Sequence, residues 1–209
     1  MDRLAAVTRT AKVNRGLAHR PPETLQSTRT LEPNGTIYVP GEIRRAIYTV
    51  DYGAVRIYRL LSNGRRQICS FEFSGDTFGF ETDMTHVFFA EAISPTRISA
   101  LNEMGDQLPS DATSWLQSME RTQRNVLVLG YRDPVERVAA FLSDLDSRQG
   151  RTGTIELLMP RADIADHLCL SIETISRVFT FLRLKGIIKL RTPRIVEIIR
   201  PRALQFLID

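Results

Sequence analysis

The stretch that most constrains this chain is residues 161–185, which read RADIADHLCLSIETISRVFTFLRLK. Apolar residues recur at helical spacing from Ala162 to Leu168, and the period then breaks at residues 169–171. Ser171 has the side chain of a helix N-cap, so a second helix is expected to begin directly after it. The pattern predicts two helices joined by a tight turn.

The second of these helices is expected to have one buried and one exposed face. Helix-turn-helix proteins present the N-terminal part of the exposed face to the DNA major groove. Arginine offers two donors that match guanine, and glutamate accepts from the amino group of cytosine. The pattern therefore favours DNA binding over a plain two-helix packing unit. The predicted buried set is Ile172, Ile175, Phe179 and Leu182, and the exposed set is Glu173, Ser176, Arg177 and Thr180.

The basic residues are distributed as expected for a protein that binds a polyanion. The chain has 209 residues, enough for two domains, and a net charge of +4. Basic residues gather between positions 183 and 202, where Glu197 is the only acidic residue. This segment follows the proposed recognition helix, where DNA phosphates would lie.

Residues 31–108 read as a series of short strands punctuated by glycine. Asn63-Gly64 is a hairpin signal, and Gly75-Asp76 marks another turn. Regular short strands with such turns indicate an antiparallel barrel or roll. The expected strands are 36–39, 47–50, 54–60, 66–71, 87–93 and 96–101.

Residues 110–131 have the pattern of a long helix with an apolar seam. Alternating spacings of three and four would place this seam against a second copy of the helix, while Leu116, Leu127 and Val128 would pack on the barrel. A monomeric amphipathic helix is the alternative. The predicted interface residues are Trp115, Met119, Thr122, Val126 and Leu129.

The run IETISR at 172–177 resembles the recognition helix of the CRP/FNR transcription regulators, with the E-x-x-S-R pattern of the FNR and FixK branches. ADIADHL followed by LSIETISRVF is most similar to the FixK branch. The resemblance covers the chain from about residue 31 onward. It implies an α+β fold: an N-terminal antiparallel β-roll (a double-stranded β-helix), a long dimerisation helix and a C-terminal winged helix-turn-helix.

That resemblance divides the chain into four units. They are a flexible basic arm at 1–30, a β-roll effector-type domain at 31–108, a dimerisation helix at 109–131 and a winged helix-turn-helix DNA-binding domain at 132–209. A short helix packed on the roll is the alternative for the arm. Asp133-Pro134 is expected to cap and start the first helix of the last unit, and residues 187–190 and 195–199 are expected to form its wing.

The implied function is that of a homodimeric DNA-binding transcriptional regulator, an activator of the FixK type connected with nitrogen fixation and contacting RNA polymerase. The implied target is a palindrome of TTGAT-type half-sites. Arg177 is expected to read guanine, Glu173 to accept from cytosine and orient Arg177, and Ser176 to meet a base edge. The residues expected to contact the DNA backbone are Arg161, Ser171, Thr174, Arg183 and Lys185.

No cofactor or metal is expected, and no enzymatic activity. Cyclic-nucleotide binders of this family hold the phosphate with an arginine after the turn at residues 75–79, but no arginine lies between Arg66 and Arg97. Phe88 and Phe89 are expected to fill the core there. An iron–sulfur cluster needs more than the two cysteines present, and three scattered histidines are typical of neither a haem site nor a cupin-like metal enzyme. Control by an unidentified small ligand in the β-roll is the alternative.

The two cysteines, Cys69 and Cys169, suggest no disulfide framework, which favours a reduced, cytoplasmic setting without membrane association. Cys69 is expected in the core. Cys169 lies in the turn before the recognition helix, where it is either a small buried residue or a redox brake. Arg161 and Arg177 would favour its thiolate, and oxidation to a sulfinic or sulfonic acid would place an anion beside the DNA phosphates.

Overall fold

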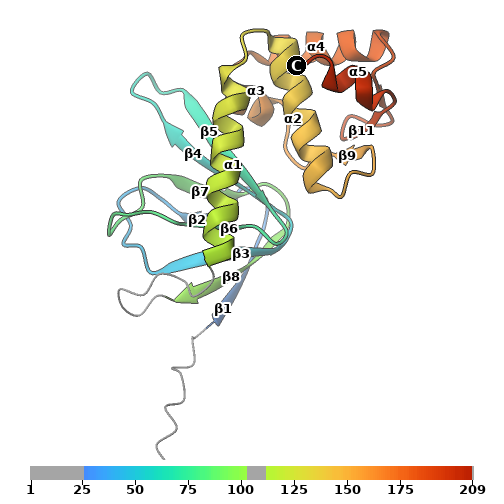
Figure 1. Cartoon of the computed structure of the whole chain (residues 1–209). Coiled ribbons are helices and arrows are strands. Elements are labelled where there is room, and N and C mark those ends of the chain that lie inside the picture. Colours follow the sequence, from blue (N-terminus) through green and yellow to red (C-terminus); the bar gives the residue numbers. More distant parts are fainter. Residues whose placement is uncertain (1–25, 103–111, 209) are drawn as a thin grey trace, which may run out of the picture.

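The computed structural model describes residues 26–102 and 112–208 (Figure 1). Within this part of the chain, the N-terminal half forms two antiparallel four-stranded sheets, ordered β1-β8-β3-β6 and β2-β7-β4-β5. These sheets form the predicted β-roll. The strands are β1 Gln26–Leu31, β2 Thr36–Tyr38, β3 Ala46–Tyr52, β4 Ala54–Leu60, β5 Arg66–Phe73, β6 Thr77–Phe78, β7 Phe89–Ala92 and β8 Thr96–Asn102.

Tight turns with glycine in the left-handed region set the strand pairing of the roll. Gly64 (φ +78°) lies in the hairpin between β4 and β5, and Gly75 (φ +89°) lies in the turn after β5, as the sequence predicts. Gly53 joins β3 to β4 at φ +89°, and a Cβ there would lie 2.5 Å from the carbonyl oxygen of Pro95. Only glycine fits such a close backbone approach.

Strand β1 corrects the predicted boundary of the N-terminal arm. The strand begins at Gln26 and pairs with β8 from Gln26–Leu101 to Leu31–Thr96, whereas the arm was predicted to extend to residue 30. Residues 27–30 are exposed and polar, so the strand is held by backbone hydrogen bonds and carries no alternating apolar signal. Residues 1–25 of the predicted arm lie outside the described residues. Strand β7 begins at Phe89 rather than at residue 87, because its pairing with β4 starts at Phe89 and the amide of Val87 donates to the Glu81 side chain.

Helix α1 (Ala112–Gly130) runs along the roll toward the C-terminal domain (Figure 1). Its roll-facing side is polar over most of its length, with Arg121 and Asn125 bonded to backbone carbonyls of Thr77 and Cys69. The prediction that Leu116 and Leu127 pack on the roll is therefore wrong, and of that set only Val128 is buried. An exposed apolar stripe follows the helix on its other side: Trp115, Leu116, Met119, Val126 and Leu127.

The C-terminal domain combines four helices, α2 to α5, with a small antiparallel sheet, ordered β10-β11-β9. Asp133 caps α2 as predicted: its Oδ1 accepts from the amide of Val135, and Glu136 accepts from the amide of Asp133. The wing is formed by β10 and β11, also as predicted. The elements are α2 Pro134–Arg148, β9 Thr154–Glu156, α3 Arg161–Leu168, α4 Ile172–Leu184, β10 Ile188–Leu190, β11 Ile195–Ile198 and α5 Pro201–Gln205, the last not foreseen.

None of the helices in the described ranges is long and apolar enough to span a membrane.

Candidate nucleic-acid interface

Helices α3 and α4 form the predicted helix-turn-helix, and the turn between them is defined by two residues. Cys169 ends α3 in the left-handed conformation (φ 55°, ψ 40°), a conformation in which helices commonly terminate. Ser171 starts α4, its Oγ accepting from the amide of Thr174 at 3.1 Å. The predicted N-cap is confirmed.

Helix α4 buries Ile175, Phe179 and Leu182 as predicted, together with Val178. Ile172 corrects the prediction, because its side chain is 48% exposed. It occupies the first position of the helix, before the turn that packs on the core. Figure 1 shows α4 lying at the outer side of the domain, away from the β-roll.

The residues predicted to contact bases, Glu173, Ser176 and Arg177, are all exposed on α4. The pKa of Glu173 is lowered by a hydrogen bond from its own amide, then by Ser171 and by the charge of Arg177. The Oγ of Ser176 donates to the carbonyl of Ile172 at 2.9 Å, so its lone pairs remain to accept. Within the described chain, Arg177 makes no hydrogen bond or ion pair that would compete with a base. The helix therefore presents a carboxylate, a hydroxyl acceptor and a guanidinium together.

A groove lies between α4 and the wing, and we call it the α4–wing groove. Arg161 and Arg183 come from the two helices, and the exposed Arg191 comes from the tip of the wing. Arg191 is already paired with both carboxylate oxygens of Glu197, at 2.9 and 3.0 Å, which leaves Arg161 and Arg183 as the groove cations that suit the phosphates of a DNA strand. The sequence placed the basic segment 183–202 where DNA phosphates would lie, but it did not single out Arg191 as a site residue. The full lining is Arg161, Ser176, Phe179, Thr180, Arg183, Leu190, Arg191, Thr192 and Pro193.

Arg161 is neither a free surface charge nor paired with an acid. Its guanidinium stacks on the ring of Phe179, 3.3 Å from the centroid, and burial lowers its pKa to about 10. Its Nη1 atom is buried without a hydrogen-bond partner in the described residues. An arginine fixed in this way is already oriented before a phosphate binds. Less side-chain conformational entropy is therefore lost when the contact forms.

The other residues predicted to contact the backbone take different positions. Arg183 and Lys185 are exposed at the C-terminal end of α4. Ser171 and Thr174 face each other, with 3.0 Å between Oγ and Oγ1. Their hydroxyl groups are therefore engaged at the N-terminal cap of α4. Lys185 lies 5.8 Å from the ring centroid of Phe181.

Cys169 is exposed, so the interpretation of this residue as a small buried one is wrong. Its thiol donates to Oε1 of Gln67, 3.1 Å away on β5. The amide group of the same Gln67 donates to the carbonyls of Asp166 and His167 at 2.9 and 3.3 Å. The β-roll thus caps the C-terminal end of α3, a contact that sequence spacing does not reveal. Cys69, predicted in the core, is half-buried, and burial raises its pKa.

Buried charges fix α3 to the β-roll. Asp163 is 2% exposed and accepts from Arg56 at 3.0 Å and from Arg66 at 2.5 Å. Arg56 also pairs with Glu91 at 2.7 Å. The two arginines belong to β4 and β5, so the first helix of the DNA-binding motif is joined directly to the N-terminal domain.

His167 completes this contact. Its Nδ1–H donates to the carbonyl of Ile68 at 3.1 Å, and its ring packs against Phe71 and Phe141. Burial lowers its pKa to about 4, so the ring is neutral at pH 7. His86 likewise stacks on Tyr38 inside the roll. Across residues 26–102 and 112–208, no three histidine, cysteine or acidic side chains come together as metal ligands.

Comparison with known proteins agrees with this geometry. Residues 28–104 match the cyclic nucleotide-binding domain, and residues 136–207 match the Crp-like helix-turn-helix domain. The chain is 46% identical to the nitrogen fixation regulation protein FixK of Rhizobium meliloti, over 85% of each chain. It is 39% identical to FixK of Azorhizobium caulinodans, over 77% of this chain and 71% of that protein. The structure of FixK2 from Bradyrhizobium japonicum superposes with a TM-score of 0.79 at 32% identity, over 88% of this chain and 97% of that one.

A β-roll joined by a long helix to a Crp-like helix-turn-helix defines a transcription regulator of the CRP/FNR class. Within that class, the chain belongs to the FixK-type family of DNA-binding regulators.

Proposed function

We propose that this chain acts as a homodimer that recognises a palindrome of TTGAT-type half-sites and activates transcription from it. The observation that carries the proposal is the exposed group Glu173, Ser176 and Arg177 on α4, beside the α4–wing groove. The helix supplies groups that can read bases, and the groove supplies cations for phosphates. Contact with RNA polymerase is proposed from the family alone.

Dimerisation is supported by the apolar stripe of α1. Trp115, Leu116, Met119, Val126 and Leu127 are between 47% and 69% exposed in one chain. Large apolar side chains that gather exposed on one helix face mark an association surface. Among the predicted interface residues, Thr122 lies beside the stripe and Leu129 is half-buried. Pairing two copies through α1 would place two recognition helices about one DNA turn apart, which requires a palindromic site.

Substitution of Arg177 tests base reading. Arg177→Ala should weaken binding to the palindrome by on the order of 1–3 kcal/mol, about 5- to 150-fold in Kd, because a two-pronged contact with guanine is lost. Discrimination at one base position of each half-site should fall with it. The measurement is a fluorescence anisotropy titration against duplexes carrying every single-base substitution.

Arg183→Ala is the matched control for Arg177→Ala, because Arg183 is exposed in the α4–wing groove but lies farther along α4. It should weaken all duplexes alike and reduce the salt dependence of binding. If Arg177→Ala lowered the affinity for every duplex by the same factor, Arg177 would not be the residue that reads a base.

We propose that the regulator binds DNA without cyclic nucleotide or iron–sulfur cluster, and that oxidation of Cys169 inhibits it. Its thiol is exposed and lies at the C-terminal end of α3, beside the turn that leads into α4. A sulfinate or sulfonate there is unfavourable beside DNA phosphates. It is also unfavourable at a helix C-terminus, where the helix dipole is negative.

Peroxide treatment tests the redox proposal. Treated wild-type protein should lose specific DNA binding, and Cys169→Ser should retain it. Peroxide-treated Cys69→Ser should lose binding as treated wild type does, because this variant keeps Cys169. Cys69 itself is half-buried in the roll and is not the proposed sensor. Equal inhibition of wild type and Cys169→Ser would overturn the proposal. The readout is the active fraction in a DNA titration, with the oxidised residue located by mass spectrometry.

A second candidate mode of control is a small ligand in the β-roll. A cavity between the roll and α1 favours it, since residues of both elements line that cavity.

A further inference from the structure

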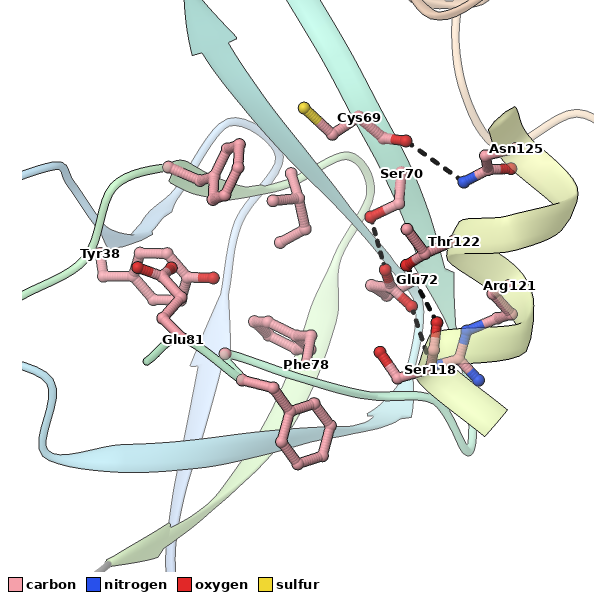
Figure 2. Close-up of a pocket in the computed structure, with 14 residues that line it drawn as sticks. Tyr38, Cys69, Ser70, Glu72, Phe78, Glu81, Ser118, Arg121, Thr122 and Asn125 are labelled. Atoms are coloured by element: carbon pink, nitrogen blue, oxygen red, sulfur yellow. Dashed lines mark hydrogen bonds and ion pairs between the residues drawn. The ribbon is translucent and has the colours of Figure 1, made fainter. Parts of the chain in front are cut away.

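A cavity of about 230 Å³ lies between the inner face of the β-roll and α1. Figure 2 shows Glu72 and Ser70 on β5 facing Ser118, Arg121 and Thr122 on the helix. We call this space the roll cavity. The lining residues that bear on ligand binding are Tyr38, Glu72, Phe78, Glu81, Arg121 and Asn125.

The central polar group of the roll cavity is the carboxylate of Glu72, which is 5% exposed. Ser70 Oγ donates to its Oε1 at 2.6 Å. Its Oε2 is buried and accepts no hydrogen bond from the described residues. A buried acceptor without a donor is costly, so this oxygen is a position where a ligand donor would be stabilised.

Arg121 does not neutralise Glu72 fully. Its Nη2 lies 3.5 Å from Glu72 Oε2, and the same nitrogen donates to the carbonyl of Thr77 at 3.1 Å. Its Nη1 pairs with Asp76, also at 3.1 Å. The guanidinium is therefore shared between two acids and one carbonyl. Burial, followed by the charge of Asp76, raises the pKa of Glu72, so the ionised carboxylate would gain from a further cation.

The rest of the lining supplies acceptors and flat apolar surfaces. Asn125 donates its Nδ2 to the carbonyl of Cys69, which leaves Oδ1 as an acceptor. Glu81 adds a second carboxylate, held by the amide of Val87 at 2.6 Å and by His86. The rings of Tyr38 and Phe78 form the apolar wall, 6.3 Å apart between centroids. A phosphate would meet two carboxylates here, and the guanidinium of Arg121, which lines the cavity, is already engaged.

We propose that the roll cavity binds a small organic cation: an amine, amidine or guanidine attached to a flat apolar body. The cationic N–H groups would donate to Glu72 Oε2, and the body would pack against the apolar wall that Tyr38 and Phe78 form. This ligand class is opposite in charge to a cyclic nucleotide. The inference does not depend on the proposed DNA site, because the roll cavity is lined by the β-roll and α1 and by no residue of α4 or the wing.

Such a ligand would bridge two parts of the molecule. Glu72 belongs to β5, which also carries Arg66 and Gln67, the residues that hold α3. Ser118, Thr122 and Asn125 belong to α1, which carries the apolar stripe. Occupancy of the roll cavity would therefore tie the helix proposed for dimerisation to the strand that positions the DNA-binding motif.

Three probes of nearly identical shape and different charge test the proposal on the full-length protein. Benzamidine is a cation at pH 7, benzamide is neutral and benzoate is an anion. Isothermal titration calorimetry should give benzamidine at least about tenfold tighter binding than benzamide, as expected for one charge-assisted hydrogen bond, and no binding of benzoate. Binding of benzoate at least as tight as that of benzamidine, or binding of none of the three, would overturn the proposal.

Two glutamine variants test whether benzamidine binds at Glu72. Glu72→Gln should remove the preference for benzamidine over benzamide, while Glu156→Gln, an exposed substitution on β9, should leave it unchanged. If Glu72→Gln does not fold, the position of the probe on the wild type is read from intermolecular nuclear Overhauser effects to the Tyr38 and Phe78 ring protons. Their absence at saturating benzamidine, or an unchanged preference in folded Glu72→Gln, would place the cation elsewhere and refute the assignment.

Discussion

Asp163→Asn is expected to destabilise the folded protein by about 3 kcal/mol, because it removes one partner of a buried charge network. Asp163 is 2% exposed, and Arg56, which it pairs with, is 7% exposed. Without the carboxylate, the partners that Arg56 keeps among the described residues are Glu91 and the side-chain oxygen of Asn34. For a chain of this size, 1 kcal/mol corresponds to about 2–4 °C, so the Tm should fall by about 6–12 °C. Thermal unfolding followed by circular dichroism measures the effect.

Asp166→Asn is the matched control on the same helix. Asp166 also pairs with Arg66, at 2.8 Å, but its side chain is 35% exposed. Water screens this pair, so its loss should cost less than about 1 kcal/mol. Equal shifts for the two variants would show that the buried network does not hold α3 on the β-roll.

Leu127→Glu is expected to abolish dimer formation and to weaken binding to the palindrome by about 10²- to 10⁴-fold. Leu127 is 69% exposed in the apolar stripe, so the charge is tolerated in a single chain but would be buried between two. A monomer loses the advantage of engaging two half-sites with one molecule, which accounts for the size of the effect. Sedimentation velocity measures the association state, and a DNA titration measures the affinity.

Gln117→Glu adds the same charge to the other side of α1, where Gln117 lines a surface depression with Arg121, Arg124 and Arg148. This variant should remain dimeric and bind DNA as wild type does. A dimeric Leu127→Glu protein with normal affinity would mean that α1 does not join the two copies.

Features encoded by neighbouring residues could be predicted from the sequence. Ser171 and Asp133 cap their helices as expected, because a cap depends on the side chain and the next three amides. The wing and the β4–β5 hairpin followed from turn residues between apolar runs. The exposure of Ile172 did not follow, because spacing alone does not show where a helix first meets the core.

Contacts between distant segments could not be predicted in the same way. Asp163 and Arg66 are 97 positions apart, and each alone reads as an ordinary surface charge. The stacking of Arg161 on Phe179 depends on how α3 packs against α4, and the capping of α3 by Gln67 depends on how the two domains meet. Leu116 and Leu127 were misassigned because the sequence does not tell which side of α1 faces the roll.

The most direct test of the account is the binding of purified, reduced protein to a duplex carrying two inverted TTGAT-type half-sites, at stated salt and without added nucleotide. We expect binding at least about 10³-fold tighter than to a scrambled duplex. This advantage should be lost when five base pairs, about half a helical turn, are inserted between the half-sites. Binding no tighter than to the scrambled duplex would contradict a dimer that is competent without a ligand.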